Sequence, residues 1–470
     1  MLPQTTTVRI PTDPHDHCDV EHGHHGFAAR AKVHVMDLIG MVLPIVVLFV
    51  LLGLGVHIGM ALGMTGLLGI FLLQGEAAAW SQLQSIPYSS GANYTLAVVP
   101  MFILMGALFT NSGYTADVFT AANRIFGGIR GGLPLATTAA SGVFGAVTGS
   151  SVANAAVFSR VSLPQMVERG VKKTLAVGSI AASGTLASLI PPSLLLVVFG
   201  IITQQSVAAL LVAGIIPGIL SMAVYLVGIH LWVRWRPETA PVAGSRTSLA
   251  DKARAILPLW SAVLVFGLVM GGIYGGLFTP TQAGAIGAFV VLVLGTVAGK
   301  SRLGLVWTAL RETGSTTAAI LLILVGGDFF SRYLGYGGVV QSISGALTRA
   351  DLPPLAYLLI FAVIVVVLGM FLEAFSIMVL VLPVMFPVLT GVGYDPVWLG
   401  VVTIKLVEIG LITPPVGLNV YVVKSASPIP LQLGEVYRGV LPFLVLDVLT
   451  LALIIAFPSI VLFLPGIMLG

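Results

Sequence analysis

Uncharged apolar stretches recur along this chain from Met36 to Leu464, with few polar residues between them. Each reaches the length of about 20 residues that a helix needs to cross the hydrocarbon core of a bilayer. Only 9% of the residues are charged and 57% are hydrophobic, whereas about 25% of the residues of a soluble domain are charged. The short alternating strands of an outer-membrane barrel are not visible in the sequence. The sequence therefore predicts an all-α polytopic membrane protein.

The composition also excludes several classes of function. The net charge of +4 is small and scattered, which does not favour nucleic-acid binding. Cys18 is the only cysteine, so the chain cannot form a disulfide framework or a cysteine metal cluster by itself. The segment Gly299-Lys300-Ser301 is similar to a phosphate loop, but Leu294 stands where that motif needs its first glycine. We expect neither an enzyme nor catalytic residues.

The segment 1–35 is rich in Pro, Thr, Asp and His and lacks the apolar pattern that follows it. We expect a disordered His-rich N-terminal extension without a cleavable signal peptide. Its imidazoles and carboxylates offer ligands for a transition metal. The spacing matches no ordered zinc motif, which favours a solvated extension or a translation start at Met36. The imidazoles belong to His15, His17, His22, His24 and His25.

Ten apolar segments are predicted to cross the membrane, and two others do not fit a simple crossing. Residues 133–160 and 354–393 are long and interrupted by Gly, Ser and Pro, which is typical of two half-length helices folded back as a re-entrant hairpin. The predicted crossings are 36–53, 57–74, 95–111, 174–203, 207–231, 255–274, 280–298, 316–333, 397–424 and 439–465.

An internal repeat appears when the chain is compared with itself at an offset of 223 residues. Pro164 then coincides with Pro387, and the pair Pro191-Pro192 coincides with Pro414-Pro415. Glycine coincidences are common in this composition, but three prolines in one register are not. The predicted organisation is an extra helix in 36–56, a first repeat in 57–231, a cytoplasmic loop and connecting helix in 232–279, and a second repeat in 280–465.

The distribution of positive charge predicts how the repeats are oriented. Each repeat makes four crossings if its hairpin returns to the side it entered from, and the helix near 255–274 starts the second repeat from the opposite face. We therefore predict inverted repeats. Lys and Arg number 16 in the connections on one side and two on the other, which places the 16 in the cytoplasm and both termini outside. The richer side comprises 112–132, 160–173, 232–254, 299–313, Lys424 and Arg438, and the poorer side includes 75–94 and 332–353.

Inverted repeats with paired broken helices are typical of secondary transporters, whose sites lie near the middle of the membrane. Pro191-Pro192 interrupts 174–203, and Pro414-Pro415 interrupts 397–424. Two successive prolines leave carbonyl groups without helical partners, and hydrocarbon cannot satisfy them. A bound cation with a preference for hard oxygen ligands, such as sodium, would satisfy them. The alternative is a kink whose carbonyls are satisfied by neighbouring Thr and Ser.

Polar residues mark each hairpin and the second broken helix. Residues 148–154 are small or polar except Val152, so a half-helix that begins there can direct free amide hydrogens at an anion. Glu373 occupies the equivalent place in the second hairpin, where a carboxylate is costly in an apolar environment. Lys405 and Glu408 are one turn apart. They predict either an internal ion pair that positions helices or direct ion binding.

Four motifs resemble the DctM-like large membrane subunit of tripartite ATP-independent periplasmic (TRAP) transporters. The motifs are Phe144–Arg160, Gly178–Ser193, Gly369–Glu373 and Val407–Tyr421, and the resemblance covers 36–465. It implies a multi-pass protein of the bacterial inner membrane that imports an organic anion such as a C4-dicarboxylate or a sugar acid. It also implies sodium coupling, no cofactor beyond that ion, an elevator motion, and two partners. These partners are a small four-helix membrane subunit and a periplasmic substrate-binding protein.

The same resemblance implies site residues. Substrate is expected between the hairpin tips, near Ser150, Ser151 and Pro192. The first sodium site is expected at Ser150, Ser151, Asn154, Gly184 and Thr185. The second is expected at Glu373, Ser376, Thr413, Gly417 and Asn419.

Two other functions compete with this interpretation. One is a stand-alone ion-coupled carboxylate or anion transporter with the same hairpins and no binding protein. The other is an ion channel or a structural subunit, but a channel needs a continuous polar pore. The polar residues here gather near the middle in two copies, which favours alternating access.

Overall fold

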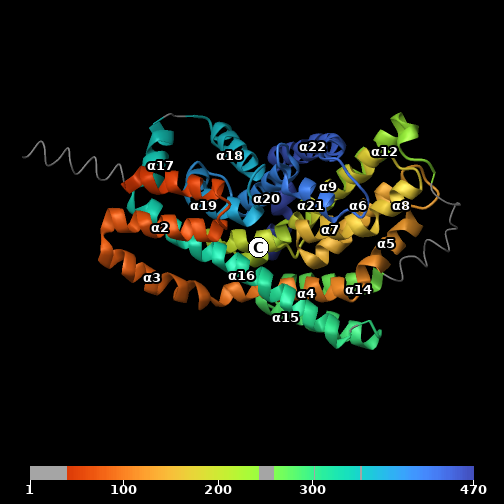
Figure 1. Cartoon of the computed structure of the whole chain (residues 1–470), viewed down its shortest axis with the longest axis horizontal. Coiled ribbons are helices and arrows are strands. Elements are labelled where there is room, and N and C mark those ends of the chain that lie inside the picture. The colour runs from red at the N-terminus through yellow and green to blue at the C-terminus, as the bar shows by residue number, and fades with distance from the viewer. Residues whose placement is uncertain (1–39, 243–258, 301, 350–351, 470) are drawn as a thin grey trace, which may run out of the picture.

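The computed structural model describes residues 40–242, 259–300, 302–349 and 352–469 (Figure 1). The regular elements in these ranges are helices, and six of them are long and apolar enough to cross a membrane. A seventh crossing results if the bent pair α9 and α10 counts as one. The all-α membrane fold is therefore confirmed. The predicted extension 1–35 lies outside the described residues.

Two helical hairpins occupy the segments predicted to be re-entrant. The first consists of α6 (Gly132–Thr148) and α7 (Ser151–Val161), and the second of α18 (Pro354–Gly369) and α19 (Ala374–Gly391). Gly149 ends α6 with a positive φ of 62°, a conformation that glycine adopts without strain. Each hairpin thus turns within two to four residues.

Two interrupted helices follow the hairpins at the predicted proline pairs. Helix α9 (Lys173–Leu189) continues as α10 (Leu194–Thr203) after a bend of 45°. Helix α20 (Pro396–Ile412) continues as α21 (Leu418–Ala426). Both Pro-Pro peptide bonds are cis. The first residues of α9 and α20 are 223 positions apart, the offset of the sequence repeat.

Further helices recur in the same order in the two halves. Helix α2 (Ile58–Gln74) has its counterpart in α15 (Pro280–Val297). The pair α11 (Val207–Ala213) and α12 (Ile215–Trp235) corresponds to α22 (Leu433–Ala456). The other helices are Gly40–Gly53, α5 (Tyr114–Ile125), α8 (Leu163–Glu168), α14 (Trp260–Tyr274) and α17 (Val339–Arg349).

Three boundaries differ from the prediction. Residues 75–94, predicted as a connection, contain α3 (Glu76–Gly91), which leads through a short 3-10 turn (Tyr94–Ala97) into α4 (Val98–Asn111). Helix α16 (Leu303–Tyr336) has 34 residues and begins well before the predicted 316–333. The last predicted span, 439–465, is divided between α22 and α23 (Ser459–Leu469). Hydropathy missed α3 and the start of α16 because both contain several polar residues, while Pro458 interrupts the last span.

Helices α3 and α4 lie one after the other along α16, and both run antiparallel to it. Ser90 of α3 donates a hydrogen bond of 2.8 Å to Asp328, and Asn111 at the end of α4 donates one of 3.0 Å to Glu312. Helix α2 packs on α16 in backbone contact, since a Cβ on Gly66 would lie 2.5 Å from the carbonyl carbon of Phe329. Such close approach by small residues is a principal means of joining helices in a membrane.

The segments rich in Lys and Arg gather at one end of the molecule. Lys300 forms an ion pair with Asp117 of α5. The backbone amide of Lys172 donates to the carbonyl of Thr239 at 2.8 Å. Arg130 and Val242 form an isolated antiparallel β-bridge. Figure 1 shows α5, α8 and α12 toward the right and α17 and the start of α3 toward the left. The described parts of the connections 112–132, 160–173 and 232–254, together with Lys300, thus lie at the same end of the molecule, as an orientation by the positive-inside rule requires.

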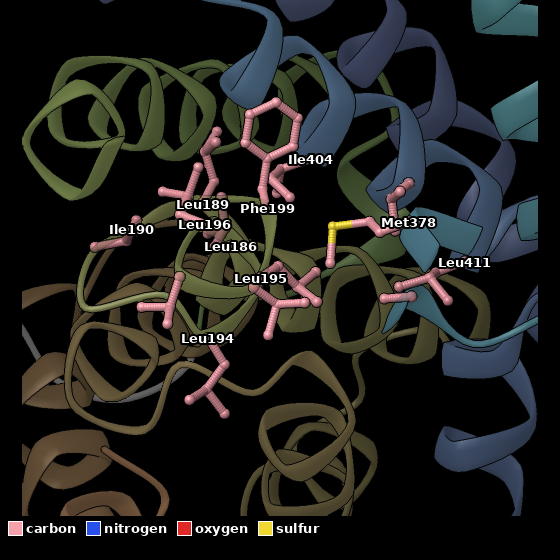
Figure 2. Close-up of a cluster of buried hydrophobic side chains, with 14 of the residues drawn as sticks. Leu186, Leu189, Ile190, Leu194, Leu195, Leu196, Phe199, Met378, Ile404 and Leu411 are labelled. Atoms are coloured by element: carbon pink, nitrogen blue, oxygen red, sulfur yellow. The ribbon is translucent and has the colours of Figure 1, made fainter. Parts of the chain in front are cut away.

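The two halves share one core. A Cβ on Gly178 of α9 would lie 2.1 Å from the carbonyl oxygen of Gly439 in α22, so these helices of opposite halves touch through their backbones. Figure 2 shows the apolar side chains around the first helix break, with Met378 and Leu411 of the second half among them. The interrupted helices therefore lie in the core that both halves share.

Candidate functional site

A cavity of about 460 Å³ lies where the tips of the two hairpins meet. Ser150 and Ser151 line it from the first tip, and Glu373, Ala374 and Phe375 line it from the second. The opposite wall comes from α4 and α16, including Gly106, Thr110, Thr316 and Ile320. One chamber thus reaches both tips and the helices beside them, although the tips are more than 200 residues apart in sequence.

The first tip presents the N-terminus of α7 to this cavity. The Ser150 side chain caps the helix by accepting a hydrogen bond of 3.3 Å from the amide of Ala153. Gly149 lies directly against the first helix break, since a Cβ there would be 2.5 Å from the carbonyl oxygen of Pro192. Pro192 is buried behind the tip and is absent from the cavity lining, which instead includes Ser188, Leu194 and Leu195.

The residues predicted for the first sodium site lie close together. Gly184 allows α7 to approach α9, since a Cβ on it would lie 3.3 Å from the Ser151 carbonyl oxygen. Asn154 is fully buried, and its amide group exchanges two hydrogen bonds with Ser141, of 2.8 and 3.0 Å. The Thr185 hydroxyl donates to the Ala182 carbonyl at 2.7 Å. Asn154 therefore braces the two arms of the hairpin, while Ser150 and Ser151 face the cavity.

The second tip repeats this geometry with a carboxylate. Glu373 caps α19, and its Oε1 accepts hydrogen bonds from the amide of Ser376 at 3.0 Å and from its hydroxyl at 2.7 Å. A carboxylate at the positive end of a helix dipole is stabilised there. The N-terminus of α19 thus already has a negative partner, whereas that of α7 has only the neutral Ser150 hydroxyl.

The other residues of the second predicted set surround the second helix break. The amide of Gly417 donates to the carbonyl of Met370 at 3.0 Å, which ties the break to its hairpin. The Thr413 hydroxyl bonds back to Ile409 at 2.5 Å. Asn419 is fully buried, and neither its amide nitrogen nor its amide oxygen has a hydrogen-bond partner. An unsatisfied buried amide is costly, which makes Asn419 a candidate ligand for a polar species.

Neighbouring side chains satisfy part of the backbone at both breaks. Ser193 donates to the carbonyl of Ser188 at the first break. The single hydroxyl hydrogen of Tyr437 on α22 is shared between the carbonyls of Pro415 and Val416 at the second. The sequence left open whether neighbouring side chains or a cation satisfy the free carbonyls. Side-chain donors reach these three carbonyls.

A family model described as "Tripartite ATP-independent periplasmic transporter, DctM component" matches residues 45–460. This chain belongs to that family. The resemblance seen in the sequence is therefore confirmed, and the protein is a multi-pass transporter subunit of the bacterial inner membrane and not an enzyme.

Curated relatives agree with this assignment, and a solved structure has a similar fold. The C4-dicarboxylate TRAP transporter large permease protein of Pseudomonas aeruginosa is 34% identical over 86% of this chain and 94% of its own length. The sialic acid TRAP transporter large permease protein of Vibrio cholerae is 34% identical over 80% of this chain and 88% of its own. The YdaH transporter of Alcanivorax borkumensis has a similar fold, with a TM-score of 0.57, 17% identity, and coverage of 82% of this chain and 89% of its own.

Charged residues at the edge of the cavity were not predicted from the sequence of this TRAP subunit. Arg160 at the end of α7 lines the cavity, and so do Asn111 and its hydrogen-bond partner Glu312. Arg160 was counted only as part of a positive connection. Its place in the cavity follows from the short length of α7, which no local pattern announces.

A second group of charged side chains is buried between helices. Lys405 Nζ lies 3.1 Å from Oε2 of Glu408, so these two residues of the predicted pair are in direct contact. Lys405 also contacts Asp447 of α22 at 2.5 Å, and Asp447 accepts a hydrogen bond of 2.6 Å from the Tyr225 hydroxyl of α12. The sequence analysis missed Asp447 and Tyr225. A lone acid within an apolar span is a signal that could have identified Asp447.

Proposed function

We propose that this TRAP large permease imports an organic anion by sodium-coupled alternating access, together with a small membrane subunit and a periplasmic binding protein. The observation that carries the proposal is the single cavity that both hairpin tips line. A site between two repeats, at the ends of broken helices, is the arrangement that secondary transporters use. Relatives named for C4-dicarboxylate and sialic acid favour a carboxylate as the substrate.

The first tip is the better place for the substrate carboxylate. The N-terminus of α7 carries the partial positive charge of its helix, and its cap is a neutral hydroxyl. The N-terminus of α19 has Glu373, which would repel an anion. Arg160 at the other end of α7 also lines the cavity, as does Glu312 of α16, so the choice of tip rests on the two helix ends. We therefore place the anion at Ser150 and Ser151.

Sodium is proposed at the two predicted sets. Glu373 offers a carboxylate, and Asn419 offers an amide oxygen that has no other partner. Hard oxygen ligands of this kind suit a small alkali cation. Ser188 near the first break is buried with a hydroxyl oxygen that also lacks a hydrogen-bond partner. The Tyr437 bonds reduce the number of carbonyls available at the second break, so the proposed second site relies on side chains.

The proposed elevator motion separates two groups of helices. Helices α2, α4, α15 and α16 pack on one another through glycines. For example, a Cβ added to Gly284 of α15 would lie 3.0 Å from the Cβ of Met101 on α4. The hairpins and broken helices pack on each other in the same way at Gly145 and Ala187 and at Gly369 and Gly410. The cavity lies between these groups. Sliding one group past the other would carry the tips, and what they hold, across the membrane.

Reconstitution tests the proposal. Liposomes that contain this chain and the small subunit should accumulate the labelled organic anion only with a sodium gradient and a loaded binding protein. Liposomes with this chain alone should not accumulate it. Uptake by the chain alone would establish the stand-alone carrier instead, and uptake that ignores sodium but follows another ion would overturn the coupling. The binding protein should be identified first, among the proteins encoded beside this subunit, because that partner selects the substrate.

A further inference from the structure

The buried group of Lys405, Glu408, Asp447 and Tyr225 joins three helices and plays no part in the proposed transport site. All four residues have a relative exposure of 0%. Lys405 and Glu408 lie on α20, Asp447 on α22 and Tyr225 on α12. Thr185 of α9 lies close enough to hydrogen bond with the Tyr225 hydroxyl. The cluster thus connects both halves of the protein.

The formal charges in this cluster do not balance. One lysine ammonium faces two carboxyl groups, and the tyrosine is neutral. If both carboxyl groups are ionised, the cluster has a net charge of −1 inside a membrane protein, where an unpaired charge is very unfavourable. Something with a charge of +1 must therefore accompany the cluster.

The surrounding helices do not supply that charge. Helices α10, α11, α18, α19 and α23, which pack against α20, contain no Asp, Glu, Lys, Arg or His, although α18 has the Tyr357 phenol. The remaining ionisable groups on α9, α12, α21 and α22 are not buried. They are Lys173, His230, Arg234, Tyr421, Lys424, Glu435, Tyr437 and Arg438.

The geometry favours a proton over a metal ion as the missing charge. None of the four residues lines the cavity between the hairpin tips, and their side chains are fully enclosed. A metal ion needs several oxygen ligands around one space, whereas a proton needs a single oxygen. Two oxygens are available without any partner, Oε1 of Glu408 and Oδ2 of Asp447.

The hydrogen bonds decide between these two oxygens. Asp447 Oδ1 receives two donors, the Lys405 ammonium at 2.5 Å and the Tyr225 hydroxyl at 2.6 Å, which stabilise an ionised carboxylate. Glu408 receives one donor, Lys405, at the longer distance of 3.1 Å. We propose that the Glu408 side chain binds a proton on Oε1 and is neutral, so that Asp447 alone balances Lys405. An unpaired hydroxyl costs far less than an unpaired buried charge.

This inference does not require substrate or sodium binding, although Thr185 of the first predicted sodium set lies beside Tyr225. It makes Glu408 a proton-binding residue that keeps the junction of α9, α12, α20 and α22 neutral. Removing the proton at high pH would create the uncompensated negative charge. The contribution of Glu408 to the stability of the folded protein should therefore be largest at acidic pH and should decrease steadily as pH rises through neutrality, because the unfolded form gains by releasing the proton while the folded form retains it.

Infrared difference spectra of the purified full chain in lipid test the proposal. Subtracting E408Q from the wild type should show the loss of a C=O stretch of a protonated carboxyl group. The matched control is E435Q, which alters an accessible acid of α22 and should lose only carboxylate bands. Loss of carboxylate bands alone in E408Q would overturn the proposal.

A second variant tests the charge balance of the cluster if E408Q does not fold, while E408Q itself separates a proton on Glu408 from one on Asp447. In D447N, Lys405 has lost its ionised partner, so Glu408 should ionise in its place and the protonated-carboxyl band should again disappear. A protonated-carboxyl band that persists in D447N contradicts the proposal. Thermal unfolding gives an independent measurement: the wild-type midpoint should fall with rising pH while the E408Q midpoint stays level, and parallel curves would also overturn it.

Discussion

The two hairpin tips occupy the same position in their repeats and have opposite electrostatic character. Both begin a helix that is capped by the side chain of the residue before it, Ser150 in one and Glu373 in the other, 223 positions apart. A hydroxyl leaves the positive helix end available to an anion, whereas a carboxylate neutralises it and attracts a cation. Repeat symmetry brings both tips to one cavity, while a single residue at each tip decides whether the positive helix end is left open or is neutralised.

The largest effect is expected from making the first tip resemble the second. Ser150→Glu should lower uptake of the organic anion about 100-fold, because a second carboxylate faces the proposed substrate. Uptake into liposomes with both partners measures it. Ser150→Thr is the control, since threonine also caps helices and should stay within about twofold of the wild type. Normal uptake by the Glu variant would remove the anion from this tip.

The next effect concerns how the first tip is fixed. Gly149→Ala combines a positive φ with a Cβ 2.5 Å from the Pro192 carbonyl oxygen, so we expect a loss of about 2–3 kcal/mol in stability. Thermal unfolding of the protein in lipid should show it. Gly113→Ala has a similar φ of +75° and open space around it, and should cost about 1 kcal/mol. Equal losses in both variants would show that the contact with the break is unimportant.

A smaller effect is expected from removing the hydroxyl groups of the first tip. The double change Ser150→Ala with Ser151→Ala should leave membrane insertion intact and raise the sodium concentration for half-maximal uptake about tenfold, equivalent to about 1.4 kcal/mol. Ser206→Ala is the matched control, because Ser206 caps α11 in the same manner outside the cavity lining. If both variants behave alike, only helix capping is lost, and the first sodium site lies elsewhere.

The smallest effect separates charge from capping at the second tip. Glu373→Gln keeps an oxygen that can accept from Ser376 but removes the charge, so sodium affinity should fall about fivefold with little change in stability. Sodium titration of uptake measures it. Ser376→Ala, which retains the charge and loses one donor, should affect sodium less. Wild-type sodium dependence in Glu373→Gln would reduce this residue to a helix cap.

Much of the architecture was predictable from local patterns. Apolar length identified the spans, and the proline pairs at 191–192 and 414–415 identified both breaks and the register of the repeat. The errors arose where these signals are weak. Helix α3 contains Gln, Ser and Pro87, and it is helical because it packs along α16, a contact that hydropathy does not contain. The polar first turns of α16 were missed for the same reason.

The candidate site was predictable only as a set of segments. Ser150, Ser151 and Glu373 line the cavity, but Asn154 turns inward to Ser141, and Tyr437 donates to carbonyls for which the sequence left open either a cation or a neighbouring side chain. Arg160 and Glu312 border the cavity although their own segments look like connections. Such contacts depend on which helices become neighbours.

By itself, the sequence determined that this chain is a helical membrane protein with two hairpins and two interrupted helices. Apolar length, proline and glycine act within one turn or one span, so a linear pattern records them. Only the tertiary structure decided which polar groups meet, because Asp447 reaches Lys405 across 42 residues and the two tips, 223 residues apart, reach one chamber. Charge balance and cavity shape are properties of those distant neighbours, and no single segment contains them.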